Sequence, residues 1–121
     1  MSKSIDTWMP LYIGDYLADT MHLTAEEHGA YFLLMMAYWK NGGALQDEDK
    51  YLASICKMSA DAWSKARAVL EPYFIIQKGK KWKHKRIEKE IKSAKELRAK
   101  KADKARNAAN ARWKYHDKSN T

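Results

Sequence analysis

Apolar residues occupy nearly every position from Ala30 to Trp39, a pattern typical of a helix that is buried on all sides. Thr24 and Glu27 have the spacing of a capping box, in which each side chain accepts a hydrogen bond from the other residue's backbone N–H. The two glycines after Asn41 tolerate the left-handed backbone that ends a helix. The pattern therefore predicts a central helix that begins after Thr24 and ends near residue 41.

Two shorter helices joined by a tight turn are predicted next. The acidic run Asp47-Glu-Asp49 favours the start of the first helix, because carboxylates stabilise the positive end of a helix dipole. Ser59 is a suitable N-cap for the second helix, and Pro72 discourages its continuation. The apolar positions of the second helix are Trp63, Ala66, Val69 and Leu70; its outward positions are Asp61, Ser64, Lys65 and Ala68, with Arg67 at the boundary. This is the helix-turn-helix pattern.

Strand-like patterns lie on both sides of these helices. The run from Trp8 to Ile13 is apolar and extended in character, and Pro10 favours an edge strand or an ordered arm that stops at Gly14-Asp15. Residues 74–86 predict a β-hairpin with a turn at 78–80. Alternation places Trp82, His84 and Arg86 on one face and Lys81, Lys83 and Lys85 on the other. A hairpin after a helix-turn-helix predicts the wing of a winged-helix domain.

From about residue 86 the apolar period becomes helical again, with Ile87, Ile91, Ala94 and Leu97 on one side. Beyond residue 99 alanines alone continue this stripe, so a helix there would bury little area. We therefore predict a mainly α fold with a small β-hairpin (α+β). It comprises a winged helix-turn-helix domain at residues 1–91 and a long basic C-terminal extension at residues 92–121, helical or partly disordered.

Charge divides the 121-residue chain into two unlike parts. Residues 1–56 contain 3 basic and 8 acidic side chains, whereas residues 57–121 contain 20 basic and 7 acidic ones. Positive charge on a helix, on the following hairpin and on a trailing arm indicates nucleic-acid binding. Most of these residues are lysine, whose ammonium group has poor bidentate geometry. We therefore expect phosphate contacts to dominate binding and sequence specificity to be modest.

The side chains expected to contact double-stranded DNA lie on the third helix, the hairpin and the tail. The helix would enter the major groove, while the hairpin would meet the backbone or an adjacent minor groove. The full set is Ser64, Lys65, Arg67, Lys78, Lys80, Lys81, Lys83, Lys85, Arg106 and Arg112. If six to eight such contacts form, raising the salt concentration from low to physiological should lower the affinity for DNA roughly 10³-fold or more.

Other chemistry finds little support in the chain. It has no Ser/His/Asp arrangement and no Gly-rich phosphate loop, and the acidic and histidine residues between Asp15 and His28 fit no standard metal site. We expect no enzymatic activity, no metal and no cofactor. The single cysteine, Cys56, is expected to be buried, and the lack of a disulfide within the chain fits a reducing cytoplasm. No apolar segment approaches the roughly 20 residues of a membrane span.

Several runs of the chain form a distinctive set. They are Met9-Pro-Leu-Tyr-Ile-Gly-Asp-Tyr-Leu17, His22-Leu-Thr-Ala-Glu-Glu-His-Gly-Ala-Tyr31, Tyr38-Trp39, Asn41-Gly-Gly43, Leu52-Ala-Ser-Ile-Cys56 and the tail ending Ala109-Asn-Ala-Arg-Trp113. In these runs the chain resembles the YdaU-type family of phages and prophages, DUF1376. The resemblance implies a winged-helix, DNA-associated role near replication initiation and supplies no catalytic residues. The chain departs from the family at Ala108-Ala-Asn-Ala, where relatives tend to be richer in glycine.

A second interpretation is a protein adaptor or inhibitor that binds a host or phage replication protein, such as a helicase or loader. Its anchors would be the aromatic side chains Tyr12, Tyr16, Tyr38, Trp39 and Trp113. Trp113 is equally suited to stack on a base. Transcriptional regulation, RNA binding and a homodimer also stay open at this point.

Overall fold

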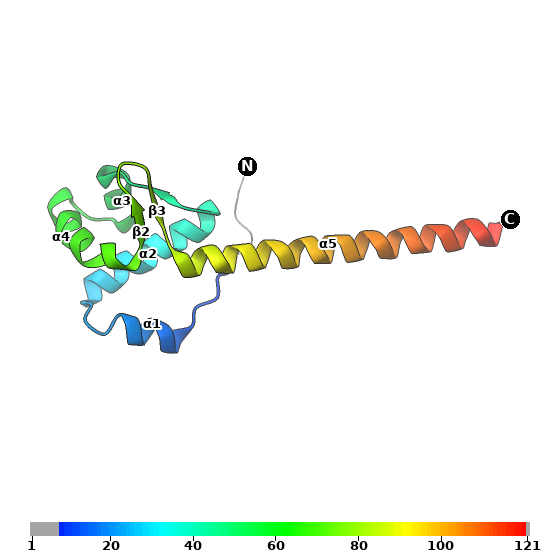
Figure 1. Cartoon of the computed structure of the whole chain (residues 1–121), viewed down its shortest axis with the longest axis horizontal. Helices are drawn as coiled ribbons and strands as arrows, with labels where there is room; N and C mark the ends of the chain where they lie inside the picture. The colour runs from blue at the N-terminus through cyan, green and yellow to red at the C-terminus, as the bar shows by residue number, and fades with distance from the viewer. Residues whose placement is uncertain (1–7, 121) are drawn as a thin grey trace. The chain divides into compact units, whose positions relative to one another are not determined.

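The computed structural model describes residues 8–120, and the side chains of residues 8–113. The chain divides into two compact units, Met1–Ile91 and Lys92–Thr121. The described part of the first unit contains, in chain order, α1 (Ile13–Asp19), α2 (Ala25–Asn41), β1 (Leu45–Gln46), α3 (Asp49–Cys56), α4 (Ala60–Leu70), the 3-10 helix η1 (Glu71–Tyr73), β2 (Ile75–Gln77) and β3 (Lys81–Lys83) (Figure 1). Helix α5 (Lys85–Asn120) begins in the first unit and continues into the second. Mostly helical structure with one small antiparallel sheet confirms the predicted α+β class.

Helix α2 is the centre of the core, as its apolar pattern predicts. Both hydrogen bonds of the capping box are present, from the Glu27 backbone N–H to the Thr24 hydroxyl at 3.1 Å and from the Thr24 N–H to the Glu27 carboxylate at 2.8 Å. Gly42, in the left-handed conformation with φ of 74°, ends the helix. Leu34 and Tyr38 are completely buried. The capping box, the glycine stop and the central position are therefore confirmed.

Helices α3 and α4 form the predicted pair. The turn between them contains Lys57, whose left-handed backbone (φ 56°) ends α3. The Ser59 hydroxyl then accepts the Ala62 N–H at 3.2 Å and caps α4. Trp63, Ala66 and Leu70 are buried along one side of α4, which leaves its other side for solvent.

The sheet has three antiparallel strands in the order β1-β3-β2, so the predicted hairpin gains a third strand. Leu45 of β1 lies opposite Trp82 of β3, and Ile76 of β2 lies opposite the same residue on the other side. Trp82 is completely buried. The sequence analysis missed β1 because two residues are too few to show alternation.

The hairpin is shorter than predicted. Strand β3 ends at Lys83, and α5 begins at Lys85, so Lys85 and Arg86 belong to the helix rather than to the wing strand. The cause is local: the His84 imidazole accepts the Ile87 backbone N–H at 3.2 Å and caps the new helix. The alternation of residues 81–86 therefore stops at His84.

The N-terminal arm also differs from its prediction. Ile13–Asp19 is a helix, with Gly14 and Asp15 inside its first turn rather than ending a strand. Tertiary packing explains the change, because the buried Tyr16 ring stacks on Phe32 with a centroid distance of 4.9 Å. The Tyr16 hydroxyl also pairs with the His28 Nδ1 at 2.7 Å. These contacts with α2 stabilise the helical conformation of α1. They join residues that are distant in sequence, so no local pattern reveals them.

Gly29 lies inside α2 and has open space where a side chain would begin. A methyl group added there would meet nothing within 4 Å. We expect Gly29→Ala to raise the free energy of unfolding by about 0.5–1 kcal/mol, because glycine loses more backbone entropy in a helix. Urea unfolding followed by circular dichroism measures this. Gly79→Ala is the matched control and should destabilise, because Gly79 has φ of +74°; a destabilised Gly29→Ala variant would contradict the prediction.

Candidate nucleic-acid interface

The exposed side of α4 carries little charge. Asp61, Ser64, Lys65 and Ala68 are exposed and lie three and four positions apart, so they form one stripe along the helix. Lys65 is the single cationic side chain in this stripe. Ser64 and Lys65 are therefore placed where the sequence analysis expects them, on a helix surface open to solvent.

The hairpin is the more cationic surface. Residues 75–83 contain four lysines and no acidic residue, and Lys78, Lys80, Lys81 and Lys83 are all exposed. Lys81 and Lys83 lie on the open face of β3, on either side of the buried Trp82. Lys78 and Lys80 flank Gly79 at the turn. Lys85 is exposed as well, at the start of α5.

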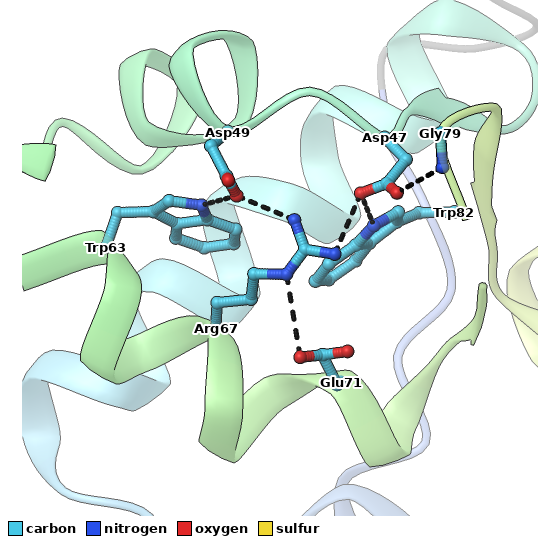
Figure 2. Close-up of polar contacts among 7 residues, drawn as sticks. All are labelled: Asp47, Asp49, Trp63, Arg67, Glu71, Gly79 and Trp82. Atoms are coloured by element: carbon cyan, nitrogen blue, oxygen red, sulfur yellow. Dashed lines mark hydrogen bonds and ion pairs between the residues drawn. The ribbon is translucent and has the colours of Figure 1, made fainter. Parts of the chain in front are cut away.

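Arg67 is placed differently from the prediction that it contacts DNA. Its guanidinium lies 3.0 Å from the Asp47 carboxylate, 2.6 Å from Asp49 and 3.5 Å from Glu71 (Figure 2). It also lies over the Trp82 ring, 5.2 Å from the ring centroid. Only 21% of the side chain is exposed. Since the guanidinium is occupied by these groups, we remove Arg67 from the expected DNA contacts.

Two tryptophans complete this cluster, which we call the Arg67 cluster and define as Asp47, Asp49, Trp63, Arg67, Glu71, Gly79 and Trp82. The Trp63 indole N–H donates to Asp49 at 2.9 Å, and the Trp82 indole N–H donates to Asp47 at 2.7 Å. The Gly79 backbone N–H donates to the second Asp47 oxygen at 2.7 Å. Figure 2 shows how these groups converge from α4, from the start of η1, from residues 47–49 before and at the start of α3, and from the hairpin.

The electrostatics of the Arg67 cluster favour ionised carboxylates. Burial by itself would raise the pKa of Asp47, but hydrogen bonds from Gly79 and Trp82 and the charge of Arg67 outweigh it and hold the pKa below its ordinary value. Hydrogen bonds from Trp63 and Arg67 likewise lower the pKa of Asp49. From the sequence alone, these two aspartates are recognisable only as residues that stabilise a helix dipole. The available sequence signal is their position at the start of a helix, and this position does not identify Trp63, Trp82 or Arg67 as their partners.

Most aromatic side chains proposed as partner anchors are in the core. Tyr38 is 0% exposed, Trp39 6% and Tyr16 9%, so the expectation that they bind a partner is incorrect. Their apolar area is already used in packing α2 and α1. Tyr12 is 49% exposed, with the Arg86 guanidinium 5.1 Å from its ring centroid. Trp113, in the second unit, is 68% exposed.

The second unit consists of the continuation of α5, so the tail is helical over its described residues. Arg106 and Arg112 are exposed. The Arg106 guanidinium forms an ion pair with Asp103 at 2.5 Å, one helical turn away. Residues 92–121 contain ten basic and three acidic side chains, which makes this unit the most cationic part of the chain.

The histidines of the first unit have structural partners. His28 bonds to Tyr16, and the His22 Nε2 lies 3.1 Å from the Tyr73 hydroxyl. Within residues 8–120, no group of three or more His, Cys, Asp or Glu is arranged to hold a metal ion. Burial raises the pKa of the Cys56 thiol to about 12, which makes it a poor nucleophile. In the described part of the chain, no helix is both long and apolar enough to cross a membrane.

Comparison with known proteins identifies relatives. Residues 7–92 match the family described as "Protein of unknown function (DUF1376)". Over 105 residues the chain is 42% identical to "Uncharacterized protein YdaU" of Escherichia coli K12, a match that covers 87% of this chain and 36% of that protein. The chain thus spans roughly a third of the relative's length, and no solved structure gives a significant match. On the extent of both matches, this chain belongs to the DUF1376 family.

Proposed function

We propose that this protein binds double-stranded DNA through a winged helix-turn-helix, without enzymatic activity. The observation that carries the proposal is the hairpin of four exposed lysines and no acidic residue, placed directly after a helix pair. The chain order of helix, strand, helix, helix and hairpin, with β3 in the middle of the sheet, supports a winged-helix arrangement. A lysine surface of this kind neutralises phosphates with little dependence on sequence.

The contacts divide between the elements. In this proposal α4 enters the major groove with Ser64 and Lys65, while Lys78, Lys80, Lys81 and Lys83 bind phosphates beside it. The helical second unit adds further phosphate contacts through Arg106, Arg112 and its lysines. Because Arg67 is held in its cluster, few groups are left to read bases. We therefore expect binding that is strong at low salt and only modestly selective.

The biological setting is part of the same proposal. The resemblance of residues 9–43 to a family of phages and prophages suggests a role in the initiation of DNA replication or in its control. A lysine-rich winged helix suits that role, since an initiation factor must hold a duplex firmly before other proteins arrive. Transcriptional regulation requires sharper base recognition than α4 offers, which makes it the weaker choice.

Titration of a fluorescein-labelled, mixed-sequence duplex by fluorescence anisotropy at several salt concentrations tests the proposal. We expect tighter binding to duplex than to single-stranded DNA, with a log–log salt slope of about −0.9 for each phosphate contact. Lys81→Ala with Lys83→Ala should reduce the slope by nearly 2. Lys40→Ala with Lys50→Ala is the matched control, since it removes the same charge from exposed positions outside the hairpin. The proposal would be overturned if both double variants reduced the salt slope equally, or if the original protein bound no duplex at low salt.

One observation favours a second candidate, a protein adaptor. Ile13, Leu17 and Met21 are 66%, 57% and 86% exposed, and they lie four residues apart along and just beyond α1. Tyr12 and Trp8, which precede this stripe in the chain, are 49% and 67% exposed. An exposed stripe of this kind is typical of protein interfaces. Failure of duplex binding in the titration would make this surface, rather than the hairpin, the functional one.

A further inference from the structure

We infer that Arg67 is a positioning residue for DNA binding, which holds the hairpin in a fixed place against α4 without touching DNA itself. The inference rests on the proposed function. It assigns to the Arg67 cluster the task of making the α4 and hairpin contacts act together on one duplex.

Arg67 connects α4 to the hairpin through its own contacts and those of Asp47. From α4 its guanidinium binds Asp49 at the start of α3 and Asp47, the residue that follows β1. Asp47 in turn accepts hydrogen bonds from Gly79 in the hairpin turn and from Trp82 in β3. One side chain thus connects the helix that carries Lys65 to the turn that carries Lys78 and Lys80.

The chemistry of arginine suits this task. The planar guanidinium has five N–H donors in a fixed fork, so it can satisfy several carboxylates at once while its face lies on an indole ring. The Asp47 side chain is only 5% exposed, and a carboxylate so buried is stable only with close partners. A lysine at position 67 supplies a single point charge and cannot make the same set of bonds.

Beyond the pairing of β1 with β3, few of the described contacts attach the hairpin turn at 78–80 to the rest of the first unit. The Asp47 backbone N–H donates to the Lys80 carbonyl at 3.0 Å, and the Trp63 and Trp82 rings meet at 5.8 Å. The Asp47 carboxylate adds the bond to the Gly79 N–H and is itself fixed by Arg67. Loosening Arg67 therefore frees the turn before it unfolds the core, and the turn lysines Lys78 and Lys80 lose their fixed spacing from Lys65.

The direction in which Asp49→Asn changes the affinity for DNA separates a positioning role from a simple effect of charge. Asp49→Asn removes a negative charge close to the interface, and by charge alone it should strengthen DNA binding. The asparagine oxygen still accepts the Trp63 indole N–H, and the position is 68% exposed, so the fold is retained. Without its charge the side chain holds the Arg67 guanidinium, which donates to the same oxygen, much less strongly. If Asp49 positions Arg67, the variant should bind the labelled duplex more weakly than the original protein.

A second variant tests the coupling to the hairpin. Arg67→Lys keeps the charge, and we expect it to lower the salt slope by nearly 2, as much as Lys78→Ala with Lys80→Ala, because both remove the two phosphate contacts of the hairpin turn. Combining all three substitutions should lower the slope little further. Amide hydrogen exchange gives a readout without DNA: exchange at Gly79 should rise in Arg67→Lys while the α2 amides stay protected.

The outcomes distinguish the two proposals. If the original protein binds no duplex, the proposed function fails and the positioning role fails with it. If it binds duplex but Asp49→Asn binds equally well or more tightly, only the positioning role is overturned. Independent effects of Arg67→Lys and the hairpin variant, adding fully in the combined protein, would also overturn it.

Discussion

Replacing Trp82 with alanine is expected to lower the free energy of unfolding by about 3–5 kcal/mol, the loss typical of a large aromatic residue removed from a core. Trp82 is 0% exposed and packs against Trp63 and Phe74, with ring centroids 5.8 and 5.0 Å away. Its indole N–H also bonds to Asp47, so the variant removes a donor from a buried carboxylate as well as apolar contact. A loss of this size is a large part of the stability of a small domain.

Urea unfolding followed by far-ultraviolet circular dichroism measures this loss. Trp8→Ala is the matched control: the same side chain is removed where it is 67% exposed, and we expect a change within about 0.5 kcal/mol. Similar losses in the two variants would contradict the central place of Trp82 in the sheet.

Lowering the pH from 7 to 4 is expected to cost the first unit about 3 kcal/mol of stability through one group, His84. Burial, aided by the nearby charge of Arg86, lowers the pKa of this imidazole from 6.5 to about 4. Its Nδ1 accepts the Ile87 N–H, so Nε2 carries the hydrogen and faces the Tyr31 hydroxyl at 2.7 Å. A second proton would have to enter at Nδ1 and would remove the cap of α5.

The direction of the effect follows from proton binding. Between pH 6.5 and 4 the unfolded chain takes up a proton at His84 that the folded protein does not, so stability falls as the pH falls through this window. The loss is about 1.4 kcal/mol for each pKa unit and levels off below pH 4. Above pH 6.5 the group is neutral in both states and contributes no pH dependence.

His84→Asn supplies the control for this prediction. Asparagine is a good N-cap and does not titrate, so the variant should keep α5 while losing the stability change between pH 6.5 and 4. Asp47 and Asp49 have lowered pKa values and titrate below this window. A variant with the same pH profile as the original protein would show that another group is responsible.

The parts of the fold that sequence could predict are those fixed by neighbouring residues. The capping box of Thr24, the Ser59 cap and the glycine stop of α2 act over three or four positions, and each is where the sequence placed it. The helix α1 and the strand β1 depend on distant contacts. Tyr16 needs Phe32, and Leu45 needs Trp82, and no local pattern carries that information.

The candidate site also has a part that local sequence predicts and a part that depends on distant contacts. Exposed lysines on a hairpin can be recognised from alternation, and Lys81 and Lys83 lie on the predicted face. The engagement of Arg67 could not be recognised, because its aspartate partners lie about 20 positions earlier in the chain. An arginine at the edge of a helix face looks the same in sequence whether it meets phosphate or carboxylate.

The pairing of β1 with β3 has a consequence for the synthesis of this protein. Leu45 and Trp63 leave the ribosome well before Trp82, the residue that covers both in the finished sheet. Until then the nascent chain carries apolar side chains and the Asp47 carboxylate without their final neighbours. A nascent chain whose emerged part ends before Lys81 is therefore prone to association with other unfolded chains, whereas one whose emerged part reaches beyond residue 91 can complete its core.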